Sequence, residues 1–441
     1  MPPKPDLRKR LLPEPPTDDD AKRPLGFVDC LALGINGIIG SGIFFLPAVL
    51  QRHAGSASWL SWLVVGGLCI VVALCFAEAA SRTTQSGGPY RYAVDAFGRY
   101  AGFGVGWITL TSSVLGYAAV ARGFAEHGAS LAGTTSAPAL VAWVVALVGG
   151  LGALNAWGIR PSARTGDVVG GAKLVALAGF VLFGAWALHR GDGPSLTAPS
   201  QPVHGVVAGA MAGLFACTGF EYVPVPAGET KRPERLVGLA MVLSLCVSVA
   251  VYALVQRVFS GAASWAPSLA TSKTPLADAA GVLGGSFFAR AVSVLAMVSS
   301  FGFCTGSALV APRYVESFAV DGFLPSLLGR RLSRRNTPLW AIVAVSGLVL
   351  GLAGTVDFGS LADISTLAVV AQYASTCAAV LVLRQRRGRA PFTLPLGPLL
   401  PLLGLAGCVV FVSQVARGEL LLAAALLGAG VVVAVVSRVS R

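Results

Sequence analysis

The stretch GIIGSGIF at residues 37–44 lies inside an apolar run from Leu25 to Leu50. It places three glycines and a serine within six positions, from Gly37 to Gly42. Glycine in a helix interior costs about 1 kcal/mol relative to alanine, so a helix that only crosses lipid would avoid this composition. Unwound backbone inside a membrane is tolerated only where it is buried in protein or lines a cavity. The stretch therefore predicts a broken helix next to an internal site.

The composition of the whole chain places it in a membrane. Hydrophobic residues make up 55% and charged residues 12%, with a mean hydropathy of +0.73, whereas a soluble domain carries about 25% charged residues. Apolar runs long enough to cross a bilayer as a helix recur along the chain. We expect an all-α integral membrane protein with about twelve transmembrane helices, near 25–50, 57–81, 100–125, 137–157, 166–188, 204–228, 236–260, 287–312, 338–356, 359–383, 395–416 and 418–437.

The distribution of cations sets the expected orientation. With these spans, 25 of the 33 Lys and Arg residues fall on the side of the termini, seven on the other side, and Lys173 within a span. Because short cytoplasmic loops are enriched in cations, both termini are expected in the cytoplasm of a multi-pass protein of the cell membrane. The net charge of +13 then needs no nucleic-acid partner, and the eight cysteines lack metal-ligand spacing, so no metal or cofactor is indicated.

A second broken span is expected at 204–228, where the sequence GLFACTGFEYVPVPAGE occupies residues 213–229. It is the sixth span, five after the first broken one, so each repeat unit would hold five spans, an odd number. Repeat units of five spans have opposite topology, and paired breaks of this kind point to a transporter site. We expect a five-plus-five inverted repeat (the LeuT-type fold) with two extra C-terminal helices.

The domain boundaries follow from that count. Residues 1–24 are proline-rich and charged and are expected to form a disordered cytoplasmic tail. The first repeat, spans 1–5, covers 25–190, and the second, spans 6–10, covers 204–390. Residues 395–441 hold spans 11 and 12 and a short cytoplasmic tail.

The two breaks together suit a zwitterionic ligand. The N-terminus of a half-helix offers free N–H groups to a carboxylate, and the C-terminus of a half-helix offers carbonyls to an ammonium. We assign the substrate carboxylate to the amides around Gly40, Ser41 and Gly42. We assign the amino group to carbonyls near Ile38 in span 1 and near Phe215, Ala216, Thr218 and Gly219 in span 6. The alternative is that the glycines serve only close helix packing.

Five stretches along the chain resemble the amino acid–polyamine–organocation (APC) transporter superfamily. They are GIIGSGIFFLP, FAEAASRTTQSGGPYRYAVDAFG, NAWGIRPSARTGDVVGGAKL, TGFEYVPVPAGETKRPER and PRYVESFAVDGFLPSLL, in the expected order over about residues 25–390. The resemblance implies that Gly40, Ser41 and Gly42 form the substrate turn and that Phe215 is an aromatic gate. It also places the span-6 acid at Glu221 and the span-5 lysine of proton-coupled members at Lys173.

One feature departs from the family pattern. Pro224 and Pro226 follow Glu221, and both are unusual there. We expect them to shorten or re-aim the second half of span 6.

Two charges within spans are candidates for proton coupling. Burial disfavours the charged form of a lysine, so the ammonium of Lys173 can release its proton during a transport cycle. The resemblance places it where relatives hold sodium, between spans 1, 5 and 8, with Ser299 and Ser300 as neighbours. The alternatives are a permanently bonded structural ammonium for Lys173 and a structural role at the helix break for Glu221.

The sequence therefore predicts a secondary active amino acid transporter, with an amino acid and a proton as partners alongside membrane lipid. Proton-coupled uptake of neutral amino acids by alternating access is the first interpretation. A proton-independent exchanger of cationic amino acids or amines is the alternative, and a channel or an amino acid sensor ranks below both. No catalytic set is brought together by the sequence, so no enzyme is expected, and no oligomer is indicated.

Overall fold

The computed structural model describes residues 23–134, 136–190, 203–272, 274–332, 336–394 and 396–413, and a few single positions beyond them. These residues form helices and turns and no β-sheet. The α-helices are α3 (Phe27–Ile38), α4 (Gly42–Ala54), α5 (Ser58–Ala80), α6 (Pro89–Phe97), α7 (Arg99–Leu131), α8 (Ala137–Trp157), α9 (Ile159–Arg190), α10 (Val203–Cys217), α11 (Pro233–Trp265), α12 (Pro275–Val320), α13 (Leu339–Thr355), α14 (Phe358–Arg387) and α15 (Leu399–Val412). Short 3₁₀ turns are η1 (Gly55–Ala57), η2 (Phe220–Tyr222), η3 (Ala227–Glu229), η4 (Pro267–Thr271) and η5 (Ser326–Gly329).

The helices have the length and composition of membrane spans. Among the described residues, eight helical stretches are long and apolar enough to cross a bilayer, and α3, α13 and α15 are shorter apolar helices. The chain is therefore an integral, multi-pass, all-helical membrane protein. Residues 1–22 of the predicted tail and nearly all of the predicted span 418–437 lie outside the described residues.

Proline and glycine set many of the helix ends. Proline occupies the first turn of α6, α8, α11 and α12, where its missing N–H would have no intrahelical acceptor. Glycines with positive φ follow α6, α8 and α14, at Gly98, Gly158 and Gly388. Because glycine carries no Cβ, the chain turns sharply at these points, and the next helix starts directly after Gly98 and Gly158.

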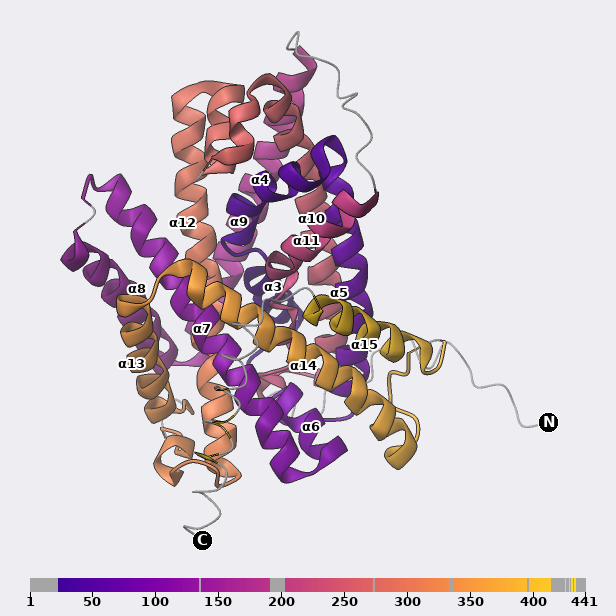
Figure 1. Cartoon of the computed structure of the whole chain (residues 1–441). Helices are drawn as coiled ribbons and strands as arrows, with labels where there is room; N and C mark the ends of the chain where they lie inside the picture. The colour runs from indigo at the N-terminus through magenta and orange to yellow at the C-terminus, as the bar shows by residue number, and fades with distance from the viewer. Residues whose placement is uncertain are drawn as a thin grey trace.

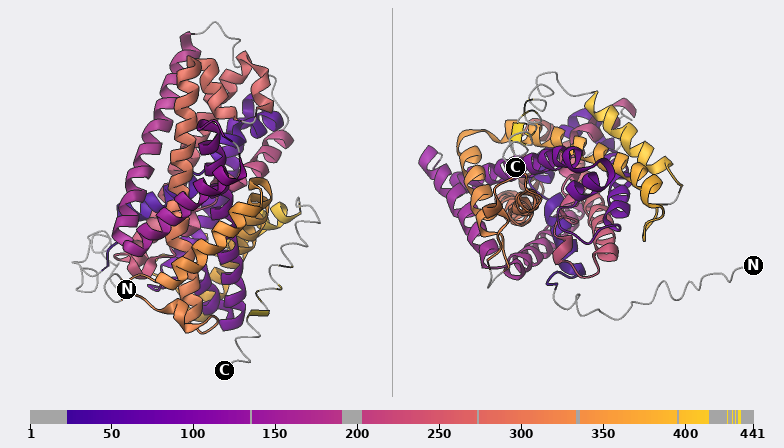
Figure 2. Two further views of the ribbon diagram at one scale, coloured as in Figure 1. Left: turned by 90° about the vertical axis from the view of Figure 1, so that its left-hand side faces the viewer. Right: turned by 90° about the horizontal axis from the view of Figure 1, so that it is seen from below.

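The core consists of two hydrophobic clusters with the broken helices at their boundary. One cluster is built mainly on α4, α5, α10 and α11, and the other on α7, α8, α12 and α13. α3 contributes Ile38 to the first and Leu33 to the second, while η2 contributes Phe220 and Tyr222 in the same way. Figure 1 shows α3 near the middle of the bundle with α14 crossing in front of α7, and Figure 2 shows the long helices from the side and from below.

The predicted span 204–228 is an α-helix only in its first half. α10 ends at Cys217, and the chain continues through the 3₁₀ turns η2 and η3 until α11 begins at Pro233. Gly219 has φ +109°, and Pro224 and Pro226 have no N–H to donate to a preceding carbonyl. The second half of the span therefore forms short 3₁₀ turns in place of an α-helix, which agrees with the expected shortening by the prolines.

Candidate functional site

The first predicted break is present in the structure. α3 ends at Ile38, Ile39 adopts a non-helical conformation (φ −80°, ψ 80°), and α4 begins at Gly42 with Ser41 as its N-cap. The carbonyls at the end of α3 and the N–H groups at the start of α4 have no intrahelical partners. The break therefore presents both kinds of backbone group within a few residues.

The two breaks touch each other. A Cβ on Gly219 would lie 2.1 Å from the carbonyl oxygen of Gly37, and a Cβ on Gly42 would lie 2.7 Å from the Cβ of Ala216. Only glycine allows backbone to approach backbone this closely. The glycines near the two breaks thus allow close packing of the two unwound segments. The same close packing places the backbone groups of both breaks next to each other.

The predicted carboxylate side retains donors that the protein does not use. The N–H of Gly40 is engaged, since it donates to the carbonyl of Ile38 at 2.9 Å. Gly42 and Ile43 open α4, where N–H groups have no intrahelical acceptor. The Ser41 hydroxyl is buried and has no hydrogen-bond partner among the described residues. An anion at this point would find Ser41 and the first turn of α4.

The carbonyls that were predicted to bind the substrate amino group already accept hydrogen bonds from protein side chains. The hydroxyl of Tyr252 on α11 lies 2.8 Å from the carbonyl oxygen of Ile38 and 3.1 Å from that of Ala216. The Phe215 carbonyl accepts from the Thr218 hydroxyl at 2.8 Å. A carbonyl oxygen has two lone pairs, so an ammonium at Ala216 or Phe215 would share the oxygen with these donors.

Tyr252 and Ser299 are site residues that the sequence reasoning missed or placed only loosely. Tyr252 is fully buried and joins the two breaks through its hydroxyl. Ser299 on α12 donates to the carbonyls of Ile39 and Gly40, each at 2.9 Å, as alternatives for its one proton. A tyrosine hydroxyl usually finds a hydrogen-bond partner when it is buried, and that tendency was the available signal for Tyr252.

Lys173 lies directly against the first break. Its side chain is fully buried, and Nζ donates to the Ile39 carbonyl at 2.5 Å and lies 3.5 Å from the Ser299 carbonyl. No described carboxylate forms an ion pair with it. Ser299 is a neighbour as expected, whereas the Ser300 hydroxyl bonds to Ala296 within its own helix. The ammonium therefore holds backbone carbonyls of spans 1 and 8.

Glu221 bonds to the second break. Its side chain is 2% exposed, and Oε2 accepts from the N–H of Gly219 and the hydroxyl of Tyr373, both at 2.8 Å. These contacts fix the positive-φ turn and tie it to α14. Phe215, the predicted gate, is half-buried and packs against the cluster that contains Phe303.

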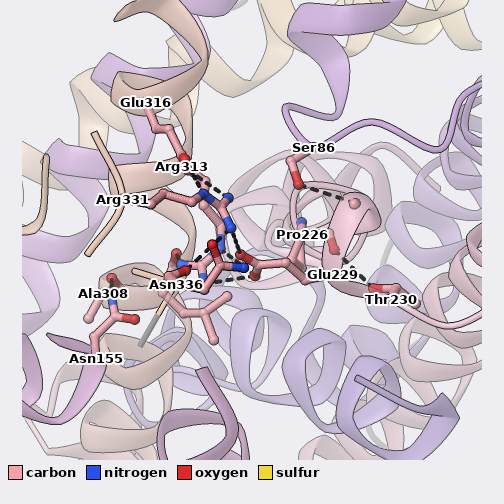
Figure 3. Close-up of polar contacts among 12 residues, drawn as sticks. Ser86, Asn155, Pro226, Glu229, Thr230, Ala308, Arg313, Glu316, Arg331 and Asn336 are labelled. Atoms are coloured by element: carbon pink, nitrogen blue, oxygen red, sulfur yellow. Dashed lines mark hydrogen bonds and ion pairs between the residues drawn. The ribbon is translucent and has the colours of Figure 1, made fainter. Parts of the chain in front are cut away.

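A buried ion network closes the end of the molecule where α3 begins (Figure 3). The Glu229 carboxylate accepts from Arg313 at 2.9 and 3.0 Å and from Arg331 at 3.1 Å, and Arg331 also pairs with Glu316. The N–H of Leu25 donates to the Glu229 carbonyl at 3.0 Å. The segment after the second break is thus tied to α12, to the loop before α13, and to the start of α3.

Several known proteins that are similar to this chain in sequence are transporters. The sequence model of the family described as amino acid permease matches residues 25–434. The chain is 27% identical over 414 residues to the methylthioribose transporter of Bacillus subtilis (strain 168), covering 88% of this chain and 87% of that protein. It is 28% identical over 403 residues to the serine/threonine exchanger SteT of the same strain, covering 88% and 90%. An uncharacterized transporter of Mycobacterium tuberculosis (strain ATCC 25618 / H37Rv) is 30% identical over 416 residues, covering 94% and 91%.

Proposed function

Because the chain belongs to the amino acid permease family, whose matched relatives are transporters and not enzymes, we propose that it takes up neutral amino acids together with protons by alternating access. The site is the pair of touching breaks. Ser41 and the first turn of α4 hold the substrate carboxylate, the carbonyls of Ile38 and Ala216 receive its amino group, and Phe215 covers it. Gly40, Gly42, Thr218 and Gly219 shape the turns.

Twelve spans in a five-plus-five inverted repeat are part of this proposal. α3 with α4 would form the first span and α10 with η2 and η3 the sixth, each broken near its middle. The cation distribution supports termini in the cytoplasm and a place in the cell membrane. The ion network around Glu229 would then close the cytoplasmic side.

The observation that carries proton coupling is the contact of Lys173 with the first break. A fully buried ammonium without a described counter-charge donates to the Ile39 carbonyl, two residues before Ser41 of the proposed carboxylate site. Loss of its proton would replace a charged donor to that carbonyl by the weaker donor of a neutral amine, so protonation and the shape of the break are linked. Glu221 is the second candidate, although its bonds to Gly219 and Tyr373 equally suit a purely structural role.

The test is uptake into liposomes that contain the purified protein. Labelled serine, threonine, alanine, leucine and arginine are supplied in sodium-free buffer, with and without an inward proton gradient. One net charge moved through 100 mV supplies about 2.3 kcal/mol, enough for roughly 50-fold accumulation of a neutral amino acid. We expect gradient-driven accumulation in the wild type, its loss in Lys173→Ala, and wild-type behaviour of Lys231→Ala, which removes an exposed loop lysine.

Exchange is the second candidate, favoured by the relative named as a serine/threonine exchanger. An exchanger would take up label only when unlabelled amino acid is present inside, regardless of the proton gradient. Uptake of arginine in that mode would point to cationic substrates. Either result would leave Lys173 with a structural role.

A further inference from the structure

A small cavity lies beside α3, between Asp29 and Asn36. It has a volume of about 20 Å³, lies between α3, α9 and α12, and is lined by Asp29, Asn36, Gly166 and Thr305 among others. A cavity of this size holds one water molecule where polar groups surround it. It begins at the end of the molecule where α3 starts and reaches the last turn of α3 before the break.

Asn36 has an unused acceptor in this cavity wall. Its side chain is 1% exposed, Nδ2 donates to the Gly166 carbonyl at 2.7 Å, and Oδ1 has no partner among the described residues. Orphaned buried acceptors are rare and call for an explanation. Oδ1 of Asn36 and Nζ of Lys173 lie 2.5 and 2.9 Å from the point where a Cβ on Gly302 would stand, so the two atoms are within about 5.4 Å of each other. One water molecule bridges such a distance with two ordinary hydrogen bonds.

Two carboxyl groups lie at one end of the cavity. Asp29 of α3 lines it, and Asp167 of α9 follows the lining residue Gly166. Both are half-buried and close enough to interact electrostatically. Two carboxylates in contact repel when both are ionised, so such a pair holds a proton between them. Among the described residues, Oδ1 of Asp167 has no hydrogen-bond partner. The ion pairs found there involve neither Asp29 nor Asp167. The pair is therefore able to take up and release a proton.

We propose that the Asp29–Asp167 pair and Asn36 form a proton route between Lys173 and the solvent at the end where α3 begins. The inference rests on the proposed proton coupling and deepens it. The Lys173 ammonium gives a proton to a water held by Asn36 Oδ1, and a proton then moves along the cavity to a carboxylate of the pair. The products are a neutral amine and a carboxylic acid, which then loses its proton to solvent. Asn36 is a positioning residue, and the carboxyl pair carries the proton.

The other titratable groups facing this path are thiols. Cys30 on α3 lies close to both carboxyls, and Cys304 on α12 lies close to Lys173. Both are buried, and a buried thiol in apolar surroundings keeps its proton at neutral pH. Neither competes with the carboxyl pair as the exchanging group.

The experiment compares two transport modes of the full chain in liposomes, using the labelled amino acid that the wild type takes up best. Counterflow at equal pH needs no net proton movement, whereas gradient-driven uptake does, and a dye in the lumen reports acidification. In the double variant Asp29→Asn/Asp167→Asn, the rates of gradient-driven uptake and of acidification should fall about tenfold or more. A positioned proton donor can change the rate of a proton transfer by about 10²–10⁴-fold, so a tenfold loss is a conservative expectation. Counterflow should persist. Glu126→Gln, an exposed acid on α7, is the matched control.

Each outcome decides the inference. A double variant that accumulates label and acidifies the lumen like the wild type overturns the route while leaving proton coupling intact. A wild type that ignores the proton gradient overturns the proposed function and the route with it. If the double variant loses both modes, the single variants decide: each should shift the pH at which gradient-driven uptake is half-maximal, and unshifted profiles overturn the route.

Discussion

Replacing Gly219 by alanine tests whether contact between the two breaks holds the site together. Gly219 has φ +109°, and its missing side chain makes room for the backbone of span 1. A Cβ there would lie 2.1 Å from the carbonyl oxygen and 2.2 Å from the carbonyl carbon of Gly37, and 2.8 Å from the N of Ile38. These neighbours are backbone atoms, so no side-chain rotation relieves the overlap.

The expected cost has two parts. A non-glycine residue held at this φ costs about 1–3 kcal/mol. Forcing a methyl group into a closely packed contact adds about 1–3 kcal/mol. The sum of about 2–6 kcal/mol is a large share of the roughly 5–15 kcal/mol by which proteins are stable. Since any relief must move Gly219 away from Gly37, the substrate site should open as stability falls.

The assay pairs thermal unfolding in detergent with uptake in liposomes. Gly179→Ala is the matched control, because it lies in α9 with open space where its Cβ would stand, and helical alanine is favoured by about 1 kcal/mol over glycine. We expect Gly219→Ala to unfold at a clearly lower temperature and to lose uptake, with the control at or above wild type. A Gly219→Ala protein as stable and active as the control would refute the argument from close contact.

Two further substitutions test contacts that join distant parts of the chain. Tyr252→Phe removes the hydroxyl whose one proton serves the carbonyl of Ile38 or that of Ala216. Leaving that buried carbonyl without this donor should cost about 1–3 kcal/mol of stability in thermal unfolding; an unchanged unfolding temperature would mean that the hydroxyl contributes nothing. Glu229→Gln removes the charge opposite buried Arg313, and we expect the free energy of unfolding to fall by about 3 kcal/mol. This is the lower end of the range for breaking a buried ion pair, because the glutamine amide oxygen still accepts a hydrogen bond. The half-exposed pair made by Asp95 is the control, and Asp95→Asn should cost less than about 1 kcal/mol; equal losses would contradict a special role for the network.

Local composition was enough to predict the class and the two breaks. Glycine and proline act on the backbone at their own positions, so GIIGSG predicted the break after α3, and Gly219 with the prolines after Glu221 predicted the irregular segment after α10. The same holds for Lys173, because a lone cation in an apolar run needs a buried polar partner wherever the run packs.

The partners themselves were not predictable in this way. Tyr252 meets Ile38 across 214 positions of sequence, and Glu229 meets Arg313 across 84. The carbonyls that the sequence assigned to an ammonium are shared with Tyr252 and Thr218, which changes how open they are to a ligand.

The sequence by itself therefore determined that this protein is a membrane-embedded helical permease with unwound backbone in two spans. Only the tertiary structure decided which groups meet at those spans, including the approach of Gly219 to Gly37 and the cavity between Asp29 and Asn36. The physical reason is that backbone preference and hydropathy are properties of short segments. Hydrogen bonds and ion pairs depend on distances of a few ångströms between segments, and helix packing alone sets those distances.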